Sequence, residues 1–159
     1  MAGVERQMLD RIGEEVARAT SIVRYARDAR FSEHVHGGGE EFLVLAGSFH
    51  DTAGDYPEGT YVRNPIGTAH APWAGPDGAV LFVKLHQFTA ADTERVVIDT
   101  RAAQWHPGLV PGLSVLPLHE HGTYPKGSWL RSPHLSSHTP FTGPAGALIY
   151  VKTGHLAAA

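Results

Sequence analysis

Short apolar runs separated by turn residues dominate the chain between residues 31 and 88. Residues 42–49 are apolar on both faces of the predicted strand, which is typical of a strand buried on both sides in a closed barrel. Further strands are predicted at residues 60–64, 68–73 and 79–88, and Gly, Pro and Asp predict turns at 51–55, 57–59, 65–67 and 75–78. The pattern predicts an all-β fold built as a small barrel.

Length and composition narrow the class of protein. The 159 residues suffice for one ordinary domain with a real core, and 18 glycines and 11 prolines favour strands and turns over long helices. A net charge of -3 offers no basic surface for nucleic acid, and no apolar run approaches the roughly 20 residues of a membrane span. The chain has no cysteine, so it can form neither a disulfide nor a thiolate site. We therefore expect a cytoplasmic protein with no nucleic-acid and no membrane partner.

Candidate chemistry is concentrated in the stretch from His34 to Gly47. His34 and His36 are one residue apart in a segment predicted to be extended, so their side chains point to the same side. The three glycines that follow allow a sharp turn, which brings a carboxylate, Glu40 or its neighbour Glu41, to that side. With His70 from a neighbouring strand, Glu40 would complete a set of three imidazoles and one carboxylate around one divalent ion.

These residues resemble the two motifs of the cupin family. The first motif reads H-x-H, three or four residues, E, six residues and G, and it fits His34, His36, Glu40 and Gly47. The second motif reads G, five residues, P-x-G, two residues and H, and it fits Gly59, Pro65, Gly67 and His70. The position of Gly47 favours Glu40 over Glu41 as the carboxylate. The resemblance implies a jelly-roll barrel, the cupin double-stranded β-helix, with the metal ligands inside.

The segments GGGEEFLVLAG and GDYPEGTYVRNPIGTAH are similar to the corresponding sequences of the ChrR-like cupins. That group contains the sensor domain of a zinc-dependent anti-sigma factor, and its relatives include iron dioxygenases that cleave diketones and hydroxyacetophenones. The resemblance implies either an Fe(II)-dependent dioxygenase acting on a small diketone or hydroxyketone, or a non-catalytic sensor of metal, ligand or oxidative stress. Fe²⁺ or Zn²⁺ is the expected ion, with Mn²⁺ and Ni²⁺ as alternatives. The small-molecule substrate or ligand is left open.

The N-terminal segment is compatible with two structures. Val4, Met8, Ile12 and Val16 recur every four residues, as along one stripe of a short helix. The resemblance to cupins implies instead a hairpin that turns near Gly13 and leads into a strand. We favour a strand from Ala19 onward.

An internal repeat divides the chain into residues 1–90, the metal-binding barrel, and residues 91–159, a truncated and degenerate second cupin unit. Residues 124–152 align without gaps on residues 56–84, and almost half of the aligned positions are identical. The repeat has no copy of the hairpin that contains Glu40, so its strands would lack their natural neighbours. We expect them to pack on the first barrel or on a second subunit, which would make a homodimer.

Three histidines of the second half allow a further alternative. His119, His121 and His138 could form a second metal site, or they could belong to a histidine-rich surface turn. The turn is favoured, because no carboxylate hairpin follows these histidines.

Overall fold

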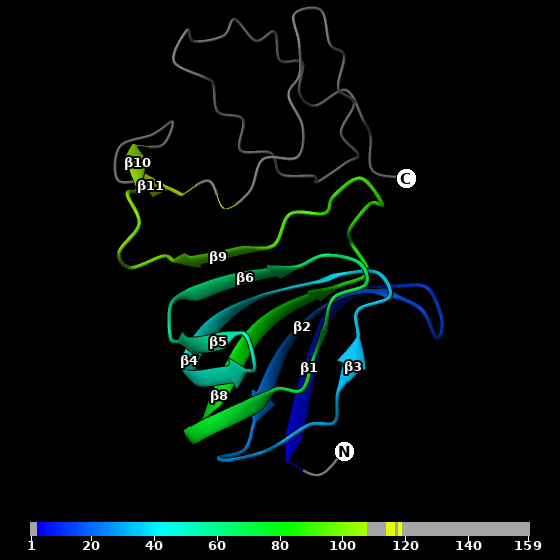
Figure 1. The fold of residues 1–159 in the computed structure, drawn as a ribbon, viewed down its shortest axis with the longest axis horizontal. Helices are drawn as coiled ribbons and strands as arrows, with labels where there is room; N and C mark the ends of the chain where they lie inside the picture. The colour runs from blue at the N-terminus through cyan, green and yellow to red at the C-terminus, as the bar shows by residue number, and fades with distance from the viewer. Residues whose placement is uncertain (1–2, 108–113, 117, 119–159) are drawn as a thin grey trace, which may run out of the picture. The chain divides into compact units, whose positions relative to one another are not determined.

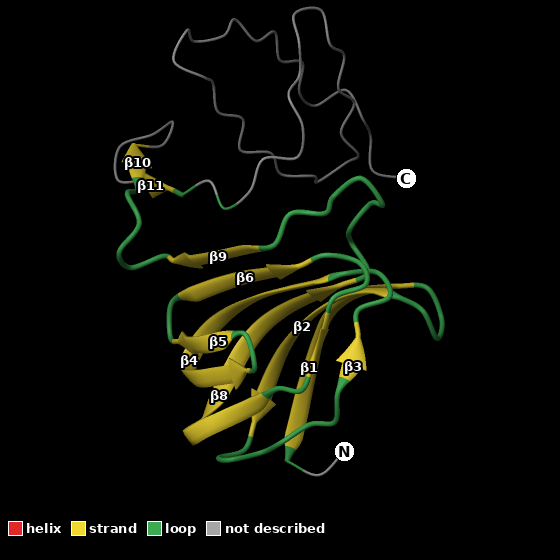
Figure 2. Cartoon of the chain, viewed as in Figure 1, coloured by secondary structure: helices red, strands yellow, loops and turns green. Residues whose placement is uncertain are grey.

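The computed structural model describes residues 3–107, 114–116 and 118, and none of these residues is helical (Figures 1 and 2). The prediction of an all-β fold is therefore confirmed. The strands are β1 (Val4–Ile12), β2 (Arg18–Tyr25), β3 (His34–Val35), β4 (Glu40–Asp51), β5 (Gly54–Pro57), β6 (Thr60–Asn64), β7 (Ala69–His70), β8 (Trp73–Leu85), β9 (Val96–Asp99), β10 (His106–Pro107) and β11 (Ser114–Val115).

One antiparallel sheet forms most of the described structure. Its strand order is β1-β2-β8-β4-β6-β9, and β5 pairs with β4 beside this path. Two smaller ladders, β3 with β7 and β10 with β11, lie outside the sheet. Since β3 and β7 carry His34 and His70, the short β3-β7 ladder places two of the predicted ligands opposite each other.

The N-terminal segment is a hairpin and not a helix. β1 pairs with β2 in an antiparallel register that runs from Val4 opposite Tyr25 to Ile12 opposite Arg18. Gly13 begins the connection with a φ of 108°, a backbone conformation that glycine adopts without steric cost. The four-residue recurrence has no helical origin, because Met8 and Ile12 lie on a strand at the edge of the sheet and are exposed.

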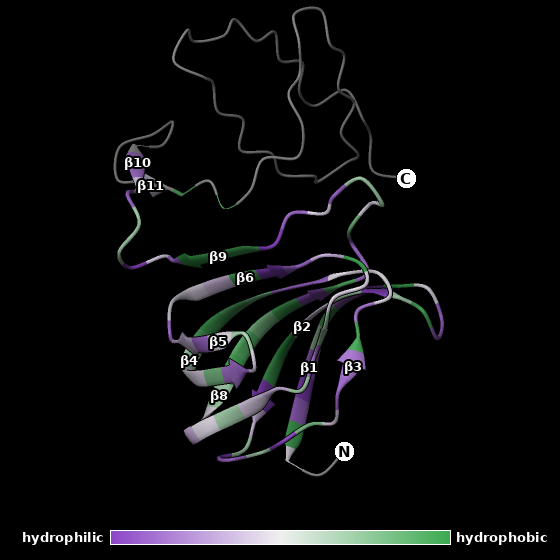
Figure 3. Ribbon diagram, in the orientation of Figure 1, coloured by the Kyte–Doolittle hydropathy of each residue, from purple (hydrophilic) through white to green (hydrophobic). Residues whose placement is uncertain are grey.

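The hydrophobic core lies on one face of the sheet, which we call the inner face. Its fully buried side chains come mainly from the central strands: Val23, Phe42, Val44, Phe49, Tyr56, Val62, Ala74, Ala79, Leu81 and Val83. Figure 3 shows hydrophobic colouring on β4 and β8, and also on parts of β2 and β9, and polar positions along β1. The Phe42 ring meets the rings of Phe49 and Tyr56 edge to face, at centroid distances of 5.5 and 5.7 Å. Each such large side chain contributes roughly 1.5–3 kcal/mol when it is fully buried.

Three expectations about the strands were wrong. Residues 42–49 are not buried on both faces, because Leu45 is 42% exposed on the face opposite the core. Residues 75–78 are not a turn between strands but a part of β8, where three extra residues bulge between the pairs Phe49–Ala74 and Gly47–Ala79. The strand expected at residues 68–73 is interrupted after His70. Pro72 lies in this interruption and has no N–H to donate to a ladder.

The chain divides into two compact units, Met1–Leu118 and His119–Ala159. Within the first unit, β9 pairs with β6 and so extends the sheet beyond residue 90. The second unit lies outside the described residues, and with it lie the repeat at residues 124–152 and His119, His121 and His138. No helix in the described part of the chain is long and apolar enough to cross a membrane.

Candidate metal centre

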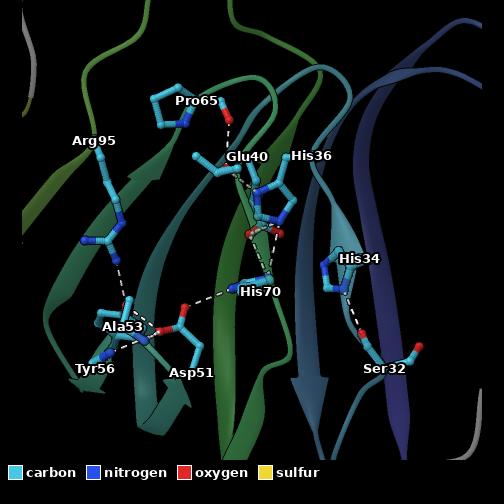
Figure 4. Close-up of polar contacts among 12 residues, drawn as sticks. Ser32, His34, His36, Glu40, Asp51, Ala53, Tyr56, Pro65, His70 and Arg95 are labelled. Carbon is cyan, nitrogen blue, oxygen red and sulfur yellow. Dashed lines mark hydrogen bonds and ion pairs between the residues drawn. The ribbon is translucent and has the colours of Figure 1, made fainter.

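Two histidines from short strands and a third that follows one of these strands meet in one cluster (Figure 4). His34 in β3 pairs directly with His70 in β7, and their ring centroids lie 4.7 Å apart. His36 follows β3 and is held by a hydrogen bond from its backbone N–H to the Thr68 carbonyl. The Nε2 atoms of His36 and His70 are 3.2 Å apart. One potential ligand atom from each of the three histidines lies within 4.8 Å of the other two.

A glycine turn connects this cluster to the main sheet. Gly39 has a φ of 75°, so the chain can reverse between His36 and β4 in three residues. The turn is closely packed, because a Cβ atom on Gly38 would lie 2.7 Å from the His86 Cα. The close approach of the turn to the end of β8 fixes where β4 begins, and β4 begins with Glu40.

The carboxylate of Glu40 points at the cluster. Its Oε2 atom lies 3.3 Å from His36 Nε2 and 3.6 Å from His70 Nε2. This oxygen is buried and has no hydrogen-bond partner among the described residues. Burial raises the pKa of the Glu40 carboxyl, while the neighbouring histidines His70 and His34 act in the opposite direction. A buried carboxylate oxygen without a donor is costly unless a cation or a proton compensates it.

Glu41 lies on the other face of β4, as the two-residue period of a strand requires. Its carboxylate accepts a hydrogen bond of 2.6 Å from the Tyr61 hydroxyl and lies 3.0 Å from Lys84 Nζ. Of the two adjacent glutamates, the structure therefore brings only Glu40 to the histidines.

The hydrogen bond that each Nδ1 makes determines which nitrogen of the imidazole carries the proton. His34 Nδ1 lies 3.1 Å from the Ser32 carbonyl oxygen, which can only accept, so this nitrogen is the donor. His36 Nδ1 lies 2.9 Å from Thr68 Oγ1, and the Thr68 hydroxyl proton is already donated to the Pro65 carbonyl. His36 Nδ1 must therefore donate as well.

The same assignment holds for His70, whose Nδ1 lies 3.0 Å from Asp51 Oδ2. Burial acts to raise the pKa of Asp51, but hydrogen bonds from His70, Tyr56 and the Ala53 amide outweigh it and lower the pKa. Asp51 is thus an ionised acceptor, and His70 Nδ1 is the donor. All three imidazoles then present an unprotonated Nε2, the form in which histidine binds metals.

Burial and neighbouring charges keep the His36 imidazole unprotonated in the absence of an ion. Burial, and after it the neighbouring His70 and His34, lower the pKa of His36 to about 4, although Asp51 acts in the opposite direction. Two unprotonated nitrogens 3.2 Å apart, with a carboxylate oxygen beside them, repel one another unless a cation lies between them.

Comparison with known proteins identifies the family of the chain. The family model of the ChrR cupin-like domain matches residues 1–89, just over half of the chain, and the chain belongs to this family. A chain in the crystal structure of Rhodobacter sphaeroides SigE in complex with the anti-sigma ChrR is 22% identical, and the match covers 54% of this chain and 46% of that one with a TM-score of 0.48.

Two further solved structures are similar. A Ralstonia eutropha protein of unknown function with a cupin-like fold is 18% identical, with 57% and 62% of the two chains covered and a TM-score of 0.49. An oxalate decarboxylase from Bacillus subtilis is 24% identical, with 49% and 24% covered and a TM-score of 0.37. This chain thus spans about half to two thirds of the length of the first two proteins. No curated protein matches it.

The structure brings His34, His36 and His70 together, and it places the Glu40 carboxylate against His36 and His70. The residues that the sequence reasoning missed are those that hold the imidazoles: Ser32, Thr68 and Asp51. The sequence predicted only that Asp51 belongs to a turn. In the structure its Oδ2 atom contacts His70, which lies nineteen positions away in the chain. A residue of this kind is not part of the motif spacing, so only the folded chain reveals it.

Proposed function

We propose that this protein binds one divalent metal ion through His34, His36, His70 and Glu40. The observation that carries the proposal is that His36 Nε2 and His70 Nε2, each unprotonated because its Nδ1 donates elsewhere, converge on a buried carboxylate oxygen that has no donor among the described residues. A ring nitrogen of His34 lies within 4.8 Å of a ring nitrogen of each of the other two histidines. Imidazole and carboxylate ligands suit Fe²⁺, Zn²⁺, Mn²⁺ and Ni²⁺, so the donor set fits each ion predicted from the resemblance.

Four protein ligands leave two positions open on an ion that accepts six. His34 is exposed while His36 and His70 are buried, so the cluster has one side toward solvent and one toward the core. On the core side the Phe49 ring packs edge to face against His70, at 6.5 Å between centroids. We expect a small oxygen-bearing ligand to reach the ion from the solvent side, where His34 is exposed, and not from the core side.

The reaction that we propose is an Fe(II)-dependent dioxygenation of a small diketone or hydroxyketone. A bound Fe²⁺ would supply the chemistry toward dioxygen. The chain itself would hold the ion, orient the substrate at the solvent side and, through Glu40, reduce the net positive charge of the centre by one. The alternative is a sensor that binds metal or ligand without turnover, which the family of the anti-sigma ChrR supports.

The first test is elemental analysis of the purified protein beside the double variant His36→Ala/His70→Ala. We expect about one metal equivalent per chain in the wild type and none in the double variant. Glu40→Gln should weaken binding, while Glu41→Gln, a neighbour on the opposite face, is the matched control and should bind as the wild type does. Two equivalents would revive the second site at His119, His121 and His138, and no metal in chelator-free protein would refute the proposal.

A second test separates enzyme from sensor. Protein loaded anaerobically with Fe²⁺ is exposed to dioxygen with a panel of small β-diketones and hydroxyketones. An enzyme consumes oxygen in proportion to substrate, and the double variant does not. Metal binding without oxygen consumption across the panel would favour the sensor.

We also propose that the protein is a homodimer. β1 is an edge of the sheet, and its Met8, Leu9 and Ile12 side chains are 43%, 52% and 60% exposed. A long edge strand with exposed apolar side chains is suited to pairing with a second copy. Light scattering should give twice the mass of one chain, and the mass of one chain would refute this proposal.

A further inference from the structure

Asp51 is buried at the end of β4, and its two carboxylate oxygens make different contacts (Figure 4). Oδ1 accepts hydrogen bonds from the Ala53 and Gly54 amides, at 2.8 and 3.1 Å, and from the Tyr56 hydroxyl at 2.9 Å. Oδ2 lies 3.0 Å from His70 Nδ1. One oxygen therefore holds the turn between β4 and β5, and the other holds the imidazole.

The contacts continue away from the cluster. The Tyr56 hydroxyl, which donates to Asp51, accepts a hydrogen bond of 2.8 Å from Arg95 Nη2. Tyr56 is 1% exposed and Asp51 is 6% exposed, whereas Arg95 is exposed, so this chain of hydrogen bonds runs from the interior to the surface. With three donors on Oδ1, the Asp51 carboxylate cannot rotate away from His70 without losing them.

We propose that Asp51 is the positioning residue of the metal centre, which acts by holding the proton of His70 on Nδ1 and so keeps Nε2 available for the ion. Tyr56 and Arg95 support it by fixing the orientation of the carboxylate. This inference rests on the proposed metal binding, because it assigns a role to Asp51 through a ligand of that ion. When a metal-binding histidine loses the hydrogen-bond partner of its other ring nitrogen, metal affinity typically falls by about 10- to 100-fold.

Asp51→Asn is a sharp test, because the amide oxygen can take the place of Oδ1 and keep the bonds from Ala53 and Gly54. The amide nitrogen then replaces Oδ2, and since it can only donate, it favours His70 with the proton on Nε2. That proton blocks the metal-binding nitrogen. We expect the dissociation constant for Zn²⁺, measured by competition with a chromogenic chelator, to rise by about 10- to 100-fold.

The same hairpin offers a matched control. Asp55 makes an equivalent contact, with its Oδ1 2.7 Å from Nδ1 of His50, but this pair lies outside the cluster and the Asp55 side chain is 81% exposed. Asp55→Asn should leave Zn²⁺ affinity unchanged. Equal affinity in Asp51→Asn and the wild type would overturn the proposal, as would an equal loss in Asp55→Asn.

A measurement without metal separates this inference from the proposed function. In the metal-free wild-type protein, ¹⁵N nuclear magnetic resonance of the imidazoles should show His70 protonated on Nδ1, and in Asp51→Asn the proton should move to Nε2. A wild-type His70 protonated on Nε2 would overturn the role of Asp51 even if the variant did not fold. Failure of the wild type to bind metal while the proton stays on Nδ1 would instead refute the metal-binding function and leave the contact as a structural one.

Discussion

The glycine turn between His36 and Glu40 gives the sharpest test of how the backbone builds the site. In the variant Gly38→Ala, the new Cβ would lie 2.1 Å from His86 Nδ1 and 2.7 Å from the His86 Cα. The imidazole can rotate away, but the Cα belongs to the backbone. Carbon atoms in favourable contact lie about 3.5–4.0 Å apart, so the turn and the end of β8 must separate by roughly 1 Å.

This separation weakens two backbone hydrogen bonds that join the turn to the residues after β8. The His86 N–H donates to the Gly39 carbonyl at 3.0 Å, and the Phe88 N–H donates to the Gly38 carbonyl at 3.3 Å. Overpacking of this kind costs about 1–3 kcal/mol, and the backbone contact places Gly38→Ala toward the upper end. The turn also sets the start of β4, so Glu40 should move relative to the histidines and metal affinity should fall with stability.

Gly37→Ala is the matched control one residue away. A Cβ atom on Gly37 would meet nothing within 4 Å, and its φ is not in the left-handed region. This variant should be neutral, or more stable by about 0.4–1 kcal/mol because the unfolded chain loses freedom. Denaturant unfolding of the metal-free proteins and Zn²⁺ titration compare the two variants. If Gly38→Ala and Gly37→Ala were equally stable and bound Zn²⁺ equally well, the close packing of the turn would not control the site.

Other contacts can be tested in the same way. Thr68→Val removes the hydroxyl that accepts the His36 Nδ1 proton, so Zn²⁺ affinity should fall about tenfold or more, and unchanged affinity in the chelator assay would contradict this role. Arg63→Met removes the guanidinium that pairs with the buried Asp92 carboxylate, and denaturant unfolding should show a loss of about 3 kcal/mol. A loss well below that value would mean that the pair contributes little. Burial and the Asp51 carboxylate raise the pKa of Tyr56 to about 12. In the unfolded chain the tyrosine side chain loses its proton near pH 10. The stability that the protonated Tyr56 hydroxyl contributes to the folded protein should therefore be complete below about pH 10 and disappear as the pH rises to about 12. Tyr56→Phe should flatten that decline in unfolding curves, and an equally steep decline would argue against the raised pKa.

The sequence predicts a strand correctly where the pattern of side chains along the strand and the turn residues at its ends indicate the same element. The strand at residues 60–64 was predicted with the bounds of β6, since Gly59 and Pro65 flank a run of large side chains. The prediction of a turn at residues 75–78 was wrong because the local signal and the strand pairing disagree there. The Gly, Pro and Asp residues of this segment are typical of a turn, but β4 pairs with β8 on both sides of the segment and holds it in the sheet as a bulge. Pairing with distant strands thus outweighed the local signal.

The proximity of the four site residues was predictable because motif spacing encodes it, whereas the groups that orient them were not. Ser32 is two residues from His34, so its contact follows closely from the local chain. Thr68 orients His36, which lies 32 positions away in the chain, so its role depends on how the two segments pair. The contact between Asp51 and His70 depends on where β4 ends relative to β7, and this in turn depends on the geometry of the whole strand β4. The sequence offers no periodic signal for it.

That geometry explains how one strand supplies both Glu40 and Asp51 to the inner face. The two residues are separated by an odd number of positions, so in a regular strand they would point to opposite faces. Between Val44 and Ala46, however, β4 advances two residues while β8 advances one, and the extra residue, Leu45, is exposed. One extra residue reverses the alternation, so Phe42 and Val44 are buried before it, and Phe49 and Asp51 are buried after it. The bulge at Leu45 therefore lets β4 contribute the carboxylate that points at the cluster at one end and the carboxylate that orients His70 at the other.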